Sequence, residues 1–175
     1  MAKRQVFFSF EYRKDVWRAG MVRSMGKVDN SSTFSDNDWE EVKWKSDAAI
    51  ELWINEQMRM RSCVVVLVWA TTSTRRWVKY EIERAYKLGK GIVGIRIDRL
   101  EDSNGNQTEK GANPFYQLYA DNGCRLSNYV ELYETDYLSS EYAYNDIKEH
   151  IEQLIERAIA KAGTYWDYGK TRNRI

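Results

Sequence analysis

An unbroken run of apolar residues, SCVVVLVWA at 62–70, limits the folds open to this chain more than any other feature. A strand with one face in water alternates apolar and polar side chains, whereas this run places apolar side chains on both faces. A strand buried on both faces is typical of a parallel sheet covered by crossover helices. The run therefore predicts an α/β fold.

Three further apolar runs have the length of strands, namely RQVFFSF (4–10), GIVGIRI (91–97) and YVELYE (129–134). Helical patterns separate or follow these runs and cover 17–25, 35–60, 73–89 and 143–163. This alternation predicts one flavodoxin-like domain with a parallel sheet of about five strands and helices on both faces. We place the domain at 1–163 and a C-terminal tail at 164–175, and we interpret the polar segment 101–114 as an insertion or lid.

The second helical pattern, 35–60, carries two more detailed expectations. Asp38 and Glu41 have the spacing of a capping box, which predicts that the helix begins there. Its later part predicts one buried face, made of Ala49, Leu52, Trp53 and Met60.

Charge and composition exclude several classes of function. The 27 basic and 26 acidic side chains are mixed along the chain, which argues against a nucleic-acid or membrane-surface protein. No apolar run is long enough for a membrane span, and the charged N-terminal segment does not resemble a signal peptide, so we expect a cytoplasmic protein. A single histidine excludes a metal site built on a pair of histidines. Two cysteines cannot form a disulfide framework, and we expect Cys63 to be buried.

One carboxylate does not fit the helix predicted at 73–89. Glu81 lies about 40° from Trp77 on a helical wheel, inside the apolar arc. A structural interpretation pairs Glu81 with a nearby cation such as Lys79 or Arg84. A functional interpretation notes that Trp77 and Glu81, four residues apart, would present a ring and a carboxylate to the same cleft. That pair would suit a cationic ligand that contains a ring.

The position of this helix favours a role at a site. In an open parallel sheet, ligands bind beyond the carboxyl ends of the strands. Two of the predicted strands end near Ser9 and Trp69, and the helix that carries Glu81 follows the second of them directly. The phosphate-binding loop of nucleotide triphosphatases does not occur in the sequence, and no G-x-G-x-x-G fingerprint of dinucleotide-binding folds follows the first predicted strand.

The same segments resemble a known family. The chain resembles the TIR domain in two places. The first is VFFSF as the first strand. The second is a later serine, tryptophan and glutamate followed by an aliphatic residue, here Ser73, Trp77, Glu81 and Ile82. The chain is also similar to the TIR-like proteins of the Thoeris anti-phage system, through AKR and VFFSF at the start, RRWV and YEI in the helix, the GI-GI-I strand, and KG and NPF after the polar loop. This likeness spans most of residues 2–116.

The resemblance implies an enzyme that cleaves the nicotinamide–ribose bond of NAD and forms a cyclic ADP-ribose isomer as an immune messenger. It implies that Glu81 is catalytic and that Ser9, Phe10 and Trp77 bind substrate. NAD is then the substrate, and no cofactor or metal is implied. The implied partner is a downstream effector reached through a diffusible cyclic nucleotide, and the resemblance also admits a homo-oligomer.

The chain departs from the usual TIR pattern at two places. Residues 27–38 replace the arginine-rich loop after the second strand, and Glu11 and Tyr12 stand where many TIR enzymes carry basic residues. Two other functions therefore stay open at this point: a non-catalytic interaction module, and a domain that senses a nucleotide without turning it over.

Overall fold

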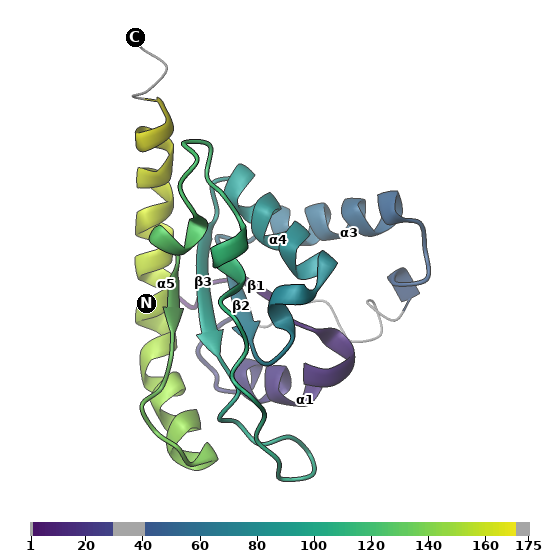
Figure 1. Ribbon diagram of the computed structural model, residues 1–175, viewed down its shortest axis with the longest axis vertical. Helices are drawn as coiled ribbons and strands as arrows, with labels where there is room; N and C mark the ends of the chain where they lie inside the picture. The colour runs from purple at the N-terminus through teal and green to yellow at the C-terminus, as the bar shows by residue number, and fades with distance from the viewer. Residues whose placement is uncertain (1, 30–40, 171–175) are drawn as a thin grey trace.

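The computed structural model describes residues 2–29 and 41–170. Its sheet contains the strands β1 (Val6–Ser9), β2 (Cys63–Val68), β3 (Gly91–Arg96) and β4 (Glu131–Tyr133). All neighbours are parallel and the spatial order is β1-β2-β3-β4 (Figure 1). Each of the four apolar runs thus forms a strand, and the predicted α/β class is confirmed.

The sheet of the described residues has four strands, not about five. A fifth strand beside β1 would have to come from the chain between the first helix and residue 47, and much of that segment, 30–40, lies outside the described residues. The same gap contains most of the loop 27–38 and the predicted cap residue Asp38. Among the described strands the spatial order follows the order in the sequence.

Helices cover both faces of the sheet, as the unbroken apolar run predicts. The helices α1 (Tyr12–Arg23) and α5 (Ser140–Lys170) pack on one face, and α3 (Asp47–Arg59) and α4 (Arg76–Lys87) on the other (Figure 1). Three short 3₁₀ helices occur at η1 (Thr72–Thr74), η2 (Pro114–Gln117) and η3 (Leu126–Asn128).

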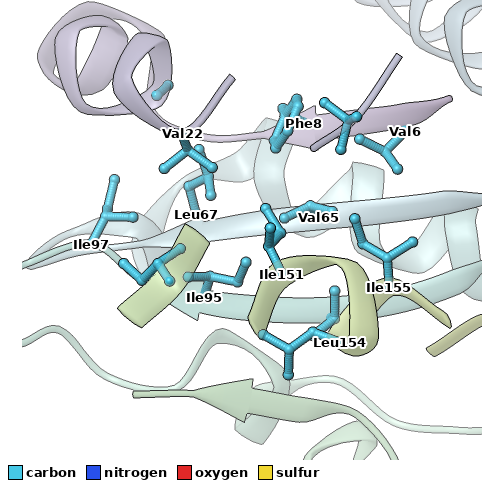
Figure 2. Packing of buried hydrophobic residues seen from close by; sticks show 14 of the residues in the cluster. Val6, Phe8, Val22, Val65, Leu67, Ile95, Ile97, Ile151, Leu154 and Ile155 are labelled. Atoms are coloured by element: carbon cyan, nitrogen blue, oxygen red, sulfur yellow. The ribbon is translucent and has the colours of Figure 1, made fainter. Parts of the chain in front are cut away.

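Alternate residues of β2 enter two separate cores. Val65 lies in the core beneath α1 and α5, where Figure 2 shows it near Ile95 of β3 and Ile151 of α5. Val64 and the other residues of opposite parity face α3 and α4. Cys63, at the start of β2, is fully buried as expected.

The helix predicted over 35–60 is interrupted, and its predicted buried face is wrong at Leu52 and Met60, whereas Trp53 packs against the core as expected. Residues 43–46 are not helical, and α3 begins after Ser46, whose hydroxyl accepts a hydrogen bond from the Ala49 amide. Leu52 and Met60 are 60% and 72% exposed, and the buried residues are instead Ile50, Ile54 and Met58. Both sets have helical spacing, so periodicity alone does not select the face that meets the sheet.

The last helix extends beyond its predicted range of 143–163, because α5 runs from Ser140 to Lys170. The division into a domain and a tail after residue 163 stays a prediction. Within the described part of the chain, every helix is too short or too polar to cross a membrane.

Candidate active site

Glu81 lies on the inner face of α4, beside the carboxyl end of β1. The helix turns Val78, Ile82 and Ala85 toward the sheet, and Glu81 falls within this buried stripe, where it is only 7% exposed. The hydroxyl of Ser9, the last residue of β1, donates a hydrogen bond to Oε2 of Glu81. The phase of the helix thus places the carboxyl group inside the protein, as the wheel predicts.

Burial dominates the electrostatics of this carboxyl group. Removal from water raises the pKa of Glu81 to about 8, and the Ser9 hydrogen bond opposes this rise because it favours the ionised form. The ion pairs of the described residues do not include one between Glu81 and either Lys79 or Arg84. The structural interpretation of Glu81 as half of an ion pair therefore finds no support in that part of the chain.

A small cavity of about 30 Å³ lies beside Glu81. Its wall is largely aromatic, and we call the group the Glu81 pocket: Phe8, Phe10, Tyr12, Trp53, Trp77, Val78 and Glu81. The rings of Phe10 and Tyr12 are stacked, with centroids 5.9 Å apart. The volume is close to that of one water molecule, whereas sites for small molecules measure roughly 300–1,000 Å³. A ligand would therefore have to displace the rings that close the pocket.

The structure brings the four predicted site residues together. Phe10 and Trp77 line the pocket next to Glu81, and Ser9 binds the Glu81 carboxyl group. Their roles in binding or catalysis stay predictions. Sequence reasoning missed the contribution of Trp53, which the helical pattern placed in the core face of α3. The high content of aromatic residues, with seven Trp and twelve Tyr, was the only hint of additional rings at a site.

An ion pair lies at the edge of the sheet, next to the Glu81 pocket. Nη2 of Arg75, just before α4, lies 2.5 Å from Oε1 of Glu11, just before α1. The Thr71 hydroxyl donates to the other Glu11 oxygen at 2.6 Å. This cluster ties the connection after β1 to the connection after β2, and we call it the Glu11–Arg75 cluster, with Thr71 as its third member.

The polar segment 101–114, interpreted above as an insertion or lid, is anchored at the same edge of the sheet. Nε and Nη2 of Arg18 donate to the carbonyl oxygens of Leu100 and Asn106, at 2.8 and 2.7 Å. Nη1 of Arg96 donates to the carbonyl oxygen of Gly111 at 2.6 Å. A Cβ atom at Gly111 would lie 1.9 Å from the carbonyl oxygen of Trp69, so the main chains meet there in direct contact.

Comparison with known proteins connects this site to a family. The family model described as "Thoeris protein ThsB, TIR-like domain" matches residues 7–102, a range that contains Ser9, Phe10, Trp77 and Glu81. A protein of Bacillus cereus (strain MSX-D12) named "Putative cyclic ADP-D-ribose synthase ThsB1" is 39% identical over 137 residues, which are 74% of this chain and 71% of that protein.

Proposed function

Since the chain belongs to the TIR-like domain family of Thoeris ThsB proteins, we propose that it cleaves the nicotinamide–ribose bond of NAD. We further propose that it closes the remaining ADP-ribose into a cyclic isomer, which serves as a messenger in anti-phage defence. The name of the Bacillus cereus relative supports the cyclic product, and NAD is the substrate that the resemblance to TIR enzymes implies.

The observation that carries the proposal is the setting of the Glu81 carboxyl group. It is buried against aromatic rings, it accepts a hydrogen bond from Ser9, and the described residues provide no cation to neutralise it. A buried acid without a charged partner is costly to maintain, which favours a role in chemistry over one in stability.

The reaction that we propose requires one carboxylate and no general acid. The bond between C1′ of ribose and the pyridinium nitrogen breaks, and its electron pair leaves with nicotinamide, which becomes neutral. The sugar carbon develops the oxocarbenium character known from glycoside hydrolysis. The ionised carboxyl group of Glu81 stabilises this cation, and the low dielectric of the pocket strengthens the attraction.

Substrate binding itself would ionise Glu81. The pyridinium ring carries a positive charge, and a positive charge nearby lowers the pKa of a carboxyl group. The rings of Phe10 and Trp77 can contact the face of the pyridinium, where a cation–π interaction adds to the attraction. Binding of the cationic ring therefore favours the form of Glu81 that the chemistry needs.

Exclusion of water decides between the two products. A nucleophile on the adenosine side of the same substrate attacks C1′ and loses a proton to give a cyclic product, whereas water gives linear ADP-ribose. The aromatic wall of the Glu81 pocket supports the cyclic outcome because apolar rings that surround the substrate keep water from the cation. Under this proposal, the partner of the protein is an effector that recognises the diffusible cyclic product.

The test is incubation of the purified protein with NAD, followed by chromatography and mass spectrometry of the products. We expect nicotinamide and a cyclic isomer from the unchanged protein, and neither from Glu81→Gln. The matched control is Glu83→Gln, which removes the same charge from an exposed position two residues away on the same helix. Equal turnover by Glu81→Gln and the unchanged protein would refute the catalytic role. NAD binding without any nicotinamide release would favour a sensing domain instead.

A further inference from the structure

The Glu11–Arg75 cluster lies at the carboxyl ends of β1 and β2, where ligands of parallel sheets bind. Glu11 follows Ser9 by two residues, and its neighbour Tyr12 lines the Glu81 pocket. Arg75 precedes Glu81 by six residues on or next to α4, which corresponds to about 9 Å along the helix axis. A ligand that reaches Glu81 from the edge of the sheet would pass this cluster.

The ion pair with Glu11 holds the side chain of Arg75 where solvent can reach it. Its side chain is 41% exposed, whereas the carboxyl group of Glu11 is largely buried. Nη2 of Arg75 contacts Glu11 at 2.5 Å and Thr71 at 3.4 Å. Nε of Arg75 is buried and finds no acceptor among the described residues. Because Nε is closed to solvent, a further anion would meet the exposed part of the guanidinium group, and Nε would gain an acceptor only when the side chain turns.

Glu11 would not be left unpaired if Arg75 turned to another anion. The Thr71 hydroxyl donates to Oε2 of Glu11 at 2.6 Å independently of the ion pair. The second partner lowers the cost of separating the two charges, because a buried carboxylate without any hydrogen bond would be strongly unfavourable.

We infer that Arg75 is a binding residue for the diphosphate group of a dinucleotide, and that Glu11 occupies its guanidinium group until the ligand arrives. This inference rests on the proposed function, since it concerns the same site. The planar fork of a guanidinium group matches phosphate oxygens, and charge-assisted hydrogen bonds of this kind are stronger than neutral ones. The doubly charged diphosphate outcompetes one carboxylate, and after the exchange the Thr71–Glu11 hydrogen bond still joins the connection after β1 to the connection after β2.

The inference predicts opposite effects for the two members of the ion pair. Arg75→Gln removes the cation and should weaken the binding of ADP-ribose, which contains the diphosphate but no bond to nicotinamide, by roughly 10- to 100-fold. Glu11→Gln removes the competing acid and should strengthen ADP-ribose binding. A merely structural pair would behave differently, because loss of either partner would weaken binding in parallel with a loss of stability.

Isothermal titration calorimetry with ADP-ribose tests this on the full chain. The matched control is Lys87→Gln, which removes one positive charge from an exposed position at the far end of α4 and should leave the affinity unchanged. Unchanged affinity in Arg75→Gln, weakened affinity in Glu11→Gln, or no ADP-ribose binding by the unchanged protein would each overturn the inference. If Arg75→Gln fails to fold, Glu11→Gln alone decides the question by the direction of its effect.

The experiment separates this inference from the proposed function. ADP-ribose binding with the expected pattern, together with no release of nicotinamide from NAD, would contradict only the proposed reaction. Cleavage of NAD with the same KM in Arg75→Gln and in the unchanged protein would contradict only the role of Arg75.

Discussion

The hydroxyl of Ser9 donates a hydrogen bond to the carboxyl group of Glu81, a residue 72 positions later in the chain. The contact joins the carboxyl end of β1 to the inner face of α4, so the site exists only when strand and helix are packed together. The hydrogen bond also favours the ionised form of Glu81 against the effect of burial. Ser9 therefore affects the pH at which the carboxyl group is charged.

Substitution of this serine should shift the pH dependence of NAD cleavage. Because burial raises the pKa of Glu81 to about 8, kcat/KM should rise with pH through neutrality as the free protein loses this proton. Ser9→Ala removes the hydrogen bond that stabilises the charge, so the rise should occur about one pH unit or more higher. The measurement is kcat/KM from about pH 6 to about pH 9. Ser24→Ala, at the end of α1, is the control, and identical profiles for Ser9→Ala and the unchanged protein would contradict the assignment.

Removal of the Glu81 charge should stabilise the fold at high pH. The folded pKa of Glu81 is above its ordinary value of 4.5 because of burial, so between about pH 4.5 and pH 8 the folded state binds more protons than the unfolded state. Stability from this group is therefore lost as the pH rises through that range. Glu81→Gln should gain stability relative to the unchanged protein, from nearly nothing at low pH to at most about 5 kcal/mol near pH 8.

Urea unfolding of both proteins at several pH values measures this difference. Burial also raises the pKa of Asp15, to about 7, but Asp15 is present in both proteins and its effect cancels in the comparison. The exposed control Glu83→Gln should show no such trend. A free-energy difference between Glu81→Gln and the unchanged protein that stays constant with pH would show that Glu81 is not a perturbed acid.

The aromatic wall should support both activity and stability. Trp53→Ala and Trp77→Ala each remove a ring that lines the Glu81 pocket, so we expect loss of NAD cleavage and a decrease of roughly 1–3 kcal/mol in the free energy of unfolding. Trp44→Ala is the matched control, since Trp44 is 75% exposed and belongs to neither core cluster of the described residues. Equal NAD cleavage by the pocket variants and the control would show that these rings do not contribute to the active site.

Gly111 should not tolerate a side chain. A Cβ atom there would overlap the carbonyl oxygen of Trp69, and neither main chain can move without disturbing the edge of the sheet. We expect Gly111→Ala to lower the melting temperature clearly. Gly20→Ala, within α1, meets no atom within 4 Å and should stabilise by about 0.5–1 kcal/mol through helix propensity. Similar melting temperatures for the two variants would contradict the close packing at Gly111.

Local patterns predicted the parts of this fold that depend on neighbouring residues. The apolar run 62–70 predicts a strand buried on both faces, which is β2. The position of Glu81 on the helical wheel predicts its inward orientation, because strand and helix periodicity determine which side a residue faces. The choice between two helical stripes in α3 required the position of the sheet, and the sequence pattern chose Leu52 instead of Ile54.

Contacts between distant segments could not be found in this way. The pairing of Glu11 with Arg75 and the presence of Trp53 near Glu81 depend on how separate elements pack, and no local pattern records such contacts. Glu11 was visible in the sequence only as an acid in an unusual place. Its pairing with Arg75 depends on the carboxyl ends of β1 and β2 lying side by side.

The burial of Cys63 gives the protein a built-in chemical reporter. The chain has two thiols, and only Cys124 is partly exposed in the fold. Burial raises the pKa of the Cys63 thiol, which suppresses the reactive thiolate. A maleimide dye should therefore attach once to the native protein, and incorporation of a second dye would reveal the opening of the sheet at the first residue of β2.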